Sequence, residues 1–214
     1  MRNRERTRDR ILKEAMDLFL GFGFSRVTMD ELAFRLGMSK KTIYEHFPSK
    51  EILVRELVKG AIRDIEREVD RIVFSRRMDF VEKLKQLLSF IGMTISNFGR
   101  AFAPDLQRKA PEVWREIDEF RKEKILANFG RLFEDGVRRG IFRRDINSEL
   151  LVRMYANTVQ ATLNPEVLSE LPVSAKDIFD GIIRVFFEGI LTERARTEHY
   201  RKGVIEGTKR SKRE

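Results

Sequence analysis

Residues 28–47 read TMDELAFRLGMSKKTIYEHF and carry the signals of two short helices. Thr28 stands at a preferred N-cap position and Glu31 follows three residues later, which is the spacing of a capping box, so the first helix is expected to begin at Met29. Gly37 adopts a left-handed conformation at little cost and is expected to end this helix. Between these points, apolar residues recur at helical spacing on one face: Leu32, Ala33 and Leu36.

The second helix is expected to span about two turns after Ser39, which is another preferred N-cap residue. Ile43 and Phe47 lie four positions apart and share one face, so they are expected to anchor the helix to a core. Pro48 disfavours helical geometry at the residue before it, and the helix is expected to end there. The stretch therefore predicts a helix-turn-helix.

The second helix presents hydrogen-bond donors on the side opposite its apolar anchor. They are Lys40, Lys41, Thr42, Tyr44 and His46. In a helix-turn-helix the first residues of the second helix reach base edges in the major groove of DNA, where lysine donates to guanine. Thr28 and Ser39 lie at helix N-termini, where backbone N–H groups and the helix dipole favour a phosphate. A solvated polar face is the alternative interpretation, but caps, turn and anchor occur together and favour double-stranded DNA as a partner.

A longer stretch, from Arg8 to Leu53, resembles the DNA-binding domain of the TetR family of transcriptional regulators and covers about a quarter of the chain. The matching positions are Ile11, Ala15, Leu18, Phe19, Phe22, Gly23, Phe24, Val27, Thr28, Ala33, Gly37, Ile43, Tyr44, Glu45, His46, Phe47, Ser49, Lys50, Glu51, Ile52 and Leu53. The resemblance implies an all-α protein. An N-terminal three-helix domain with the helix-turn-helix would bind DNA, and a helical ligand-binding and dimerisation domain would follow it.

The resemblance also implies roles for individual residues. Phosphate contacts fall to Thr28, Tyr44, His46 and Lys50, and base contacts to Lys40, Lys41 and Thr42. Lys41 occupies a position where small residues are frequent in the family, so it supplies either a base contact or a further phosphate contact. Ser39, as the cap of the second helix, completes the candidate DNA-binding residues.

The composition is that of a globular protein with a sizeable core, because 42% of the 214 residues are hydrophobic and 36% are charged. The chain has no cysteine, which excludes disulfides, thiolate metal sites and cysteine nucleophiles, and no cofactor is expected. The N-terminal residues lack the apolar core of a signal peptide, and no apolar run approaches the length of a membrane span. A cytoplasmic protein without membrane contact is expected.

The net charge of +9 is concentrated at the two ends of the chain. Residues 1–50 carry 11 Lys and Arg against 7 Asp and Glu, residues 51–193 carry 24 against 24, and residues 194–214 carry 8 against 3. The basic N-terminal region is expected to attract phosphates, whereas the neutral middle region is expected to form a domain with a function other than DNA binding. The basic tail either contacts DNA nonspecifically or is a disordered end.

Helix signals continue beyond Pro48, and no strand pattern competes with them. Helices are expected from Ser49 to about Arg71, Asp79 to about Phe98, Pro111 to about Arg139, Asn147 to Leu163, and Ser174 to about Arg196. We therefore divide the chain into a helix-turn-helix domain (1–48), a helical ligand-binding and dimerisation domain (49–198) and a basic C-terminal tail (199–214).

The last two of these helices have wide apolar stripes. One carries Leu150, Leu151, Met154, Tyr155, Val159 and Leu163, and the other carries Ile178, Ile182, Val185, Phe186 and Leu191. The final helix adds four large residues around much of its circumference, which indicates burial on more than one side: Phe179, Ile183, Phe187 and Ile190. A second subunit would supply the extra cover. The resemblance implies a homodimer through these last two long helices that reads a palindromic operator, and a core helix of a single subunit is the alternative.

The middle of the chain is rich in aromatic residues, since residues 51–193 hold 12 of the 17 phenylalanines and the single tryptophan. Apolar walls with a few polar groups are typical of ligand pockets. Candidate ligand-binding residues are Met93, Asn97, Phe98, Phe102, Trp114, Asn128, Phe129, Phe133, Tyr155 and Thr158, with Thr94 as a further polar group. Aromatic stripes at helical spacing also form plain core, which is the alternative for each of them. An apolar or aromatic small molecule of unknown identity is expected as effector.

The resulting hypothesis is a repressor that binds its operator as a dimer and is released by an effector, although the sequence leaves activation open. An enzyme is disfavoured, because the only histidines are His46 and His199 and no phosphate loop, HExxH or nucleophile motif occurs. Arg115, Arg121 and Lys122 interleave with glutamates at the spacing of surface ion pairs. A constitutive or architectural DNA-binding protein would keep the helix-turn-helix but fill its interior. A ligand carrier with a vestigial DNA-binding domain is the third alternative.

Overall fold

The computed structural model describes residues 2–97 and 102–202 of the chain. Within these ranges the backbone is helical, and the β-type pairing is limited to one isolated bridge between Phe142 and Leu191. The helices are α1 (Arg2–Phe22), α2 (Met29–Leu36), α3 (Lys40–His46), α4 (Lys50–Val73), α5 (Phe80–Asn97), α6 (Phe102–Lys109), α7 (Pro111–Arg138), α8 (Ser148–Thr162), α9 (Pro165–Glu170), α10 (Ala175–Ile190) and α11 (Glu193–Lys202). The predicted all-α fold class is confirmed.

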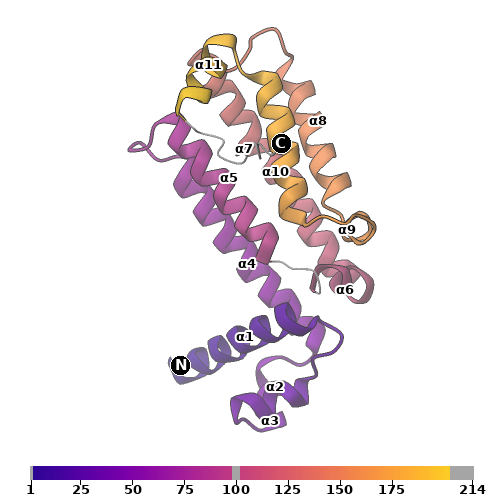
Figure 1. Ribbon diagram of the computed structural model, residues 1–214. Helices are drawn as coiled ribbons and strands as arrows, with labels where there is room; N and C mark the ends of the chain where they lie inside the picture. Colours follow the sequence, from indigo (N-terminus) through magenta and orange to yellow (C-terminus); the bar gives the residue numbers. More distant parts are fainter. Residues whose placement is uncertain (1, 98–101, 203–214) are drawn as a thin grey trace, which may run out of the picture.

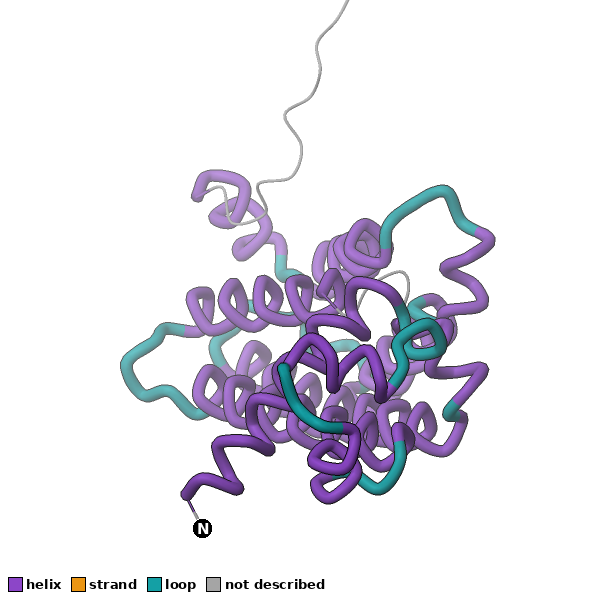
Figure 2. The backbone as a smooth tube through the Cα atoms, turned by 90° about the horizontal axis from the view of Figure 1, so that it is seen from below, coloured by secondary structure: helices purple, strands orange, loops and turns teal. Residues whose placement is uncertain are grey.

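The molecule is elongated, with a small head at one end and a helical body at the other (Figure 1). The head contains α1, α2 and α3, and α4 runs from it into the body. There α4 packs beside α5 and α7, while α8 and α10 pack on α7 and α5 and on each other. The short α6 lies where head and body meet. Figure 2, which looks at the molecule from the head end, shows these helices connected by loops.

The predicted N-caps form as expected, because a side-chain oxygen accepts a hydrogen bond from a backbone N–H of the first turn in each case. The capping residues are Thr28, Ser39, Ser49, Asn147 and Ser174. Gly37 ends α2 in the left-handed region with φ of 62°. The capping box at α2 is only half formed, since the carboxylate of Glu31 lies 3.9 Å from Arg35 Nε. A complete box forms instead at α10, between Ser174 and Asp177.

The structure differs from the sequence prediction at three short helices. α6 and α9 were not expected, and the last long helix ends at Ile190 rather than near Arg196. The chain breaks there because it pairs with the turn after α7: Arg143 N donates to Ile190 O at 2.8 Å. α11 then begins after Thr192 and includes residues 199–202, the first residues of the predicted C-terminal tail. Residues 203–214 lie outside the described part of the chain.

Two apolar cores hold the molecule together. The first joins the head to the beginning of α4, to α6 and to the first half of α7 through Leu53, Val54, Leu57, Val58, Phe102, Leu106, Ala110, Val113 and Ile117. The second fills the body between α4, α5, α7, α8 and α10. The core of the head therefore continues past Pro48 and takes in residues 102–117. In the part of the chain that the structure describes, no helix has the length and apolar character needed to cross a lipid bilayer.

Candidate DNA-binding surface and effector cavity

The second helix of the helix-turn-helix, α3, is fixed on one side and exposed on the other. Ile43 and Phe47 are buried in the first core. Ser39 Oγ accepts a hydrogen bond from Thr42 N at 3.0 Å and lies 2.8 Å from Thr42 Oγ1. The opposite face carries side chains that are exposed to solvent, among them Lys40, Lys41 and Tyr44. The helix therefore presents its donors outward on a rigid support.

Both lysines at the start of α3 already have acidic neighbours. Lys40 Nζ donates to a carboxylate oxygen of Asp30 on α2, and Lys41 Nζ lies 4.0 Å from Glu45 Oε1. All four side chains are more than half exposed. Exposed pairs of this kind contribute about 0–1 kcal/mol, so a phosphate or a guanine edge can replace the carboxylate at small cost.

Lys50, the first residue of α4, contacts the loop between α1 and α2. Its Nζ donates to Ser25 O at 3.3 Å and lies 4.4 Å from the centre of the Phe24 ring. Partial burial lowers the pKa of its ammonium, while the nearby Asp105 carboxylate acts in the opposite direction. Its charge is directed toward the loop between α1 and α2, close to an acidic residue of α6, and its contact with a DNA phosphate stays a prediction.

Asp105 on α6 is that acidic residue, and no signal in the sequence identified it. Its carboxylate accepts hydrogen bonds from the backbone N–H of Ser25 and from Ser25 Oγ, the latter at 2.6 Å. Burial raises the pKa of Asp105, but the two hydrogen bonds from Ser25 and the charges of Arg108 and Lys50 lower it more, so the pKa lies below its ordinary value. The Asp105 residue is only 9% exposed, and its carboxylate ties α6 of the body to the head.

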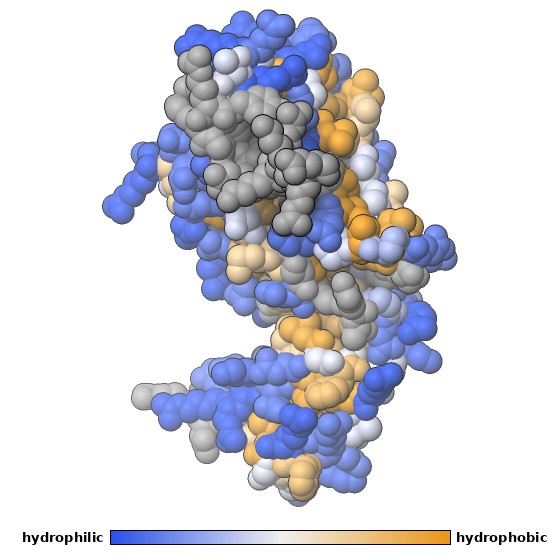
Figure 3. All heavy atoms as spheres, in the orientation of Figure 1, coloured by the Kyte–Doolittle hydropathy of each residue, from blue (hydrophilic) through white to orange (hydrophobic). Residues whose placement is uncertain are grey.

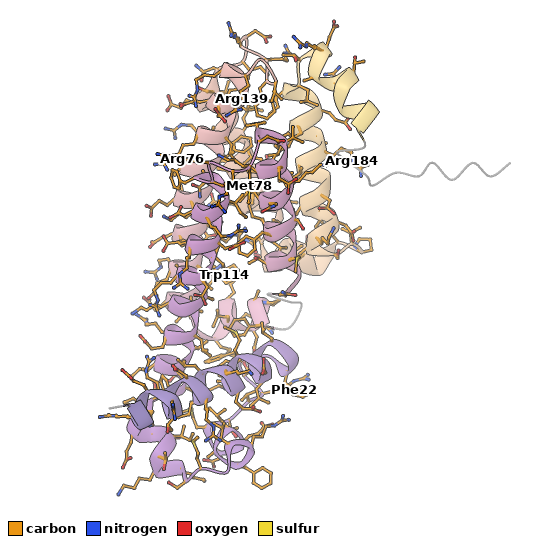
Figure 4. The ribbon with its side chains drawn as sticks, turned by 90° about the vertical axis from the view of Figure 1, so that its left-hand side faces the viewer. Phe22, Arg76, Met78, Trp114, Arg139 and Arg184 are labelled. Carbon is orange, nitrogen blue, oxygen red and sulfur yellow. The ribbon has the colours of Figure 1, made fainter. Side chains whose placement is uncertain are left out.

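A cavity of about 760 Å³ lies inside the body between α4, α5, α7, α8 and α10. This volume falls within the range of pockets for small molecules. Five of the predicted ligand-binding residues line it: Trp114, Asn128, Phe129, Phe133 and Tyr155. Thr94 lines it as well. Trp114 lies at the end of the body nearest the head, beside α4 (Figure 4).

Four other predicted ligand-binding residues lie away from the cavity. Phe102 is fully buried in the first core, where its ring stacks on that of Phe19 at a centroid distance of 6.1 Å. Met93 and Asn97 are exposed on the outer face of α5, and Thr158 donates its hydroxyl hydrogen bond to Met154 O. Helical spacing alone did not show which face of α5 and α8 points inward. Phe98 lies outside the described residues.

The cavity wall also contains charged residues that the prediction missed. Arg121 was expected in a surface ion pair, but only 23% of its side chain is exposed, and it lines the cavity. Glu66 and Lys124 face each other across α4 and α7, with Lys124 Nζ 2.8 Å from Glu66 Oε1. Burial raises the pKa of the Tyr155 hydroxyl, which is therefore neutral. Among the described residues, no three potential metal ligands of the His, Cys, Asp or Glu type come together.

The outer faces of α8 and α10 leave apolar side chains uncovered. Leu150 and Met154 on α8 are 58% and 52% exposed, and Val185 on α10 is 72% exposed. Two exposed glycines, Gly181 and Gly189, flank Val185 one turn away on either side, and a Cβ at either would meet nothing within 4 Å. Figure 3 shows apolar atoms gathered along the edge of the body over α8.

Four large residues of α10 indicated that this helix is buried on more than one side, with a second subunit as the extra cover. They are buried within a single subunit: Phe179, Ile183, Phe187 and Ile190. The intramolecular alternative therefore accounts for these four, and the uncovered surface consists of Leu150, Met154 and Val185 instead.

Comparison with known proteins agrees with the geometry of the head. Residues 11–57 match the family model of the bacterial regulatory proteins of the tetR family. Over 187 residues the chain is 30% identical to the helix-turn-helix transcriptional regulator YvaF of Bacillus subtilis (strain 168), covering 86% of this chain and 95% of that protein. It is also 30% identical over 155 residues to the transcriptional repressor KstR2 of Rhodococcus jostii (strain RHA1), covering 71% of this chain and 75% of KstR2.

Solved structures share the fold at lower identity. A TetR-family regulator from Agrobacterium tumefaciens superposes with a TM-score of 0.63 at 19% identity, covering 88% of this chain and all of that one. The complex of SmeT with triclosan gives a TM-score of 0.60 at 18% identity, covering 88% of this chain and 93% of SmeT. With its helix-turn-helix, its helical body and these full-length relatives, the chain belongs to the TetR family and is a DNA-binding transcriptional regulator.

Proposed function

We propose that this regulator is a repressor that binds a palindromic operator as a homodimer and leaves it when a small molecule occupies the body. The observation that carries the proposal is that the cavity and the head share two helices. Val58, Ala61 and Ile62 of α4 line the cavity, as do Ala103 and Pro104 of α6. Other residues of the same helices, such as Leu53 and Leu106, are buried in the core of the head.

An effector in the cavity would act on the head through these two helices. Packed cores respond to a displaced helix by moving as a unit rather than by deforming continuously. A tilt of α4 and α6 would therefore turn the head, with Asp105 and Ser25 as the polar link between them. In a dimer this rotation changes the separation of the two α3 helices from the roughly 34–36 Å that successive major grooves require. The effector binds the DNA-bound and the DNA-free conformation of the dimer with different affinities. This difference limits how far the effector can shift the protein off its operator.

We assign DNA contact to Thr28, Ser39, Lys40, Lys41, Thr42, Tyr44 and His46, which lie on α3 or at the helix starts of the head. Lys40, Lys41 and Thr42 occupy the first turn of α3, the part that reaches bases in helix-turn-helix proteins. Lys50 stays in the proposed set as a phosphate contact, because its hydrogen bond to Ser25 O is 3.3 Å long and exposed, so a phosphate can replace it. KstR2 of Rhodococcus jostii is named a repressor, which supports repression as the sign of regulation.

The first experiment is selection of bound duplexes from a random DNA library with the purified protein at two salt concentrations. Recovery of a palindrome with half-sites about one turn or more apart is expected for a specific dimeric regulator. If no motif is recovered and affinity falls uniformly as salt rises, binding rests on phosphates alone and the proposal is wrong.

Replacing both Lys40 and Tyr44 with alanine is expected to weaken binding to the recovered operator about 100-fold. A lysine contact to guanine contributes roughly 1–3 kcal/mol of discrimination, and the tyrosine hydroxyl adds a phosphate contact. Fluorescence anisotropy with labelled operator measures the change. Lys85→Ala on α5 removes an exposed charge far from the head and should leave binding unaltered. If the double variant binds the operator with unchanged affinity, the DNA contacts a surface other than the exposed face of α3.

The homodimer is assigned to the uncovered faces of α8 and α10. Leu150, Met154 and Val185 supply apolar area, and Gly181 and Gly189 allow the partner helix to approach the backbone closely. A glycine inside a helix costs about 1 kcal/mol relative to alanine, so two of them on one exposed face favour a packing role.

Val185→Glu is expected to convert the dimer to a monomer, because a charge at the centre of an apolar contact must lose its hydration. Light scattering after gel filtration should change from about twice the chain mass of 25.3 kDa to that mass. Val81→Glu makes the same substitution on the outer face of α5, where 37% of the valine is exposed, and should leave the mass unchanged. A monomeric wild-type protein at micromolar concentration would contradict the assignment.

A constitutive or architectural DNA-binding protein is the alternative that the cavity disfavours. Such a protein gains nothing from an empty interior, because each void forfeits packing energy. An operator complex that no small molecule releases, with the cavity occupied or not, would favour it.

A further inference from the structure

Charge is distributed unevenly in the cavity wall. Most of the wall is apolar, and its charged members are Glu66, Asp70, Arg121, Lys124 and Lys176. Lys124 is neutralised by Glu66, and Lys176 pairs with Asp180 one turn further along α10. Among the cations that line the cavity, Arg121 is the one whose nearest recorded carboxylate is most distant, since Nη1 is 4.0 Å from Asp118 Oδ1.

Arg121 uses little of its hydrogen-bonding capacity inside the protein. A guanidinium has five N–H donors, and the recorded acceptor here is Leu163 O at 3.5 Å, at the limit of a hydrogen bond. Burial lowers the pKa of Arg121, with Asp118 acting in the opposite direction, yet arginine stays protonated in proteins. A permanent charge that is mostly withdrawn from water and weakly paired costs energy unless an anion joins it.

The cavity is long as well as apolar. Its wall includes residues of α7 from Trp114 to Phe133, which is about 28 Å along a helix at 1.5 Å per residue. Arg121 stands about 10 Å from the Trp114 end by the same measure. Beyond it the wall is apolar and includes five phenylalanines: Phe129, Phe133, Phe142, Phe179 and Phe187. At about 30 Å³ per non-hydrogen atom, the volume of a water molecule in the liquid, the cavity of about 760 Å³ holds roughly 25 such atoms.

We propose that the effector is an elongated organic acid whose carboxylate pairs with Arg121 and whose apolar body extends along α7 toward Phe133 and Phe142. The inference rests on the proposed function, since it names the chemistry of the molecule that fills the same cavity. Guanidinium and carboxylate match each other in planar, two-pronged geometry, and the pair is strongest where water is excluded.

Trp114 supplies the readout, because it is the only tryptophan of the chain and lines the cavity. We would titrate the full-length protein at pH 7.5 with dodecanoic acid and with dodecanamide, which has the same chain and no charge. The acid is ionised at this pH. We expect the acid to bind at least ten-fold more tightly, because only the acid forms hydrogen bonds between two oppositely charged groups with Arg121. Equal affinity for both, or binding of neither, overturns the inference.

Variants test whether the carboxylate of the ligand binds at Arg121. They also separate ligand binding from the structural role of Arg121, which donates a hydrogen bond at the end of α8. Arg121→Met should abolish the preference for the acid and leave the affinity for the amide unchanged, whereas Arg121→Lys should retain part of the preference. Arg115→Met removes an arginine of the same helix that is exposed outside the cavity and should behave as wild type. If Arg121→Met weakens acid and amide equally, the arginine only supports the fold and the inference is wrong.

The titration contains no DNA, so its result does not depend on the proposed regulation. An acid preference that requires Arg121, together with an operator complex that dodecanoic acid does not release, supports the inference and contradicts the proposed release. Release of the operator by dodecanamide as readily as by the acid contradicts the inference and leaves the proposed function standing.

Discussion

Asp105→Ala is expected to lower the free energy of unfolding by about 3 kcal/mol at pH 7. The substitution removes the acceptor of two hydrogen bonds from Ser25, one from the backbone N–H and one from Oγ. Hydrogen bonds to a charged group contribute about 1.5–3 kcal/mol each, and Ser25 is exposed enough for water to replace part of the loss. Urea denaturation followed by circular dichroism measures the difference.

The pH dependence of this loss follows from the direction of the pKa shift. Because the pKa of Asp105 is lower in the folded protein, its contribution is fully present above the pKa of an unfolded aspartate, about 4. It disappears as the pH falls through the lower, folded value. The stability difference between wild type and variant should therefore shrink as the pH falls below about 4, and a difference that grows on acidification would contradict this account.

The matched control for Asp105 is Asp64→Ala, which removes an aspartate whose side chain is 75% exposed and 3.4 Å from Arg67. A change within about 0.5 kcal/mol is expected there. If Asp105 also links effector and head, Asp105→Asn should weaken the effect of the effector on operator binding more than it weakens either binding alone. If the effector changes operator binding as much in this variant as in the wild type, the link between cavity and head runs through α4 and not through Asp105.

Gly136→Ala is expected to destabilise the body by about 2–3 kcal/mol, because there is no room for the added methyl group. A Cβ at this position would lie 2.2 Å from Cδ2 and 2.5 Å from Cε2 of Phe142. The ring is held between three other aromatic rings, Phe80, Phe133 and Phe187, at centroid distances of 5.4 to 5.7 Å. The added methyl group can therefore displace the Phe142 ring only toward the cavity that the ring lines. Ligand affinity should fall together with stability, because the displaced ring takes up cavity volume.

Gly130→Ala on the same helix is the control for this prediction. The nearest atom to its added Cβ is Val152 Cγ2 at 3.9 Å, an ordinary contact. Removing a glycine from a helix interior then favours folding by about 0.5–1 kcal/mol. The melting temperatures of the two variants should shift in opposite directions. An increase for Gly136→Ala would show that the Phe142 ring moves aside without cost.

The parts of the fold that the sequence predicted are those with local causes. Thr28, Ser39 and Ser49 cap their helices with their own hydroxyl groups, and Gly37 ends α2 with its own backbone. The break after Ile190 could not be predicted this way. It depends on Phe142 and its neighbours, which lie about fifty positions earlier in the chain.

The candidate sites show the same division. The exposed face of α3 follows from Ile43 and Phe47, which are adjacent in sequence to the residues they position. Lys50 lies near Asp105 of α6, and Arg121 faces the cavity because the neighbouring helices leave space there. Neither environment is visible in a single helical stretch, because it depends on residues of other helices.

The shared core between head and body limits how such regulators can be recombined. A hybrid joined at Pro48 would separate Phe19 from Phe102, whose rings stack, and Ser25 from Asp105. The graftable unit is discontinuous: it comprises residues 1–58 together with 102–117, the second piece being inserted within the body of the recipient. Exchange of the N-terminal segment alone should yield chimaeras that misfold, whereas joint exchange of both pieces should transfer operator specificity intact.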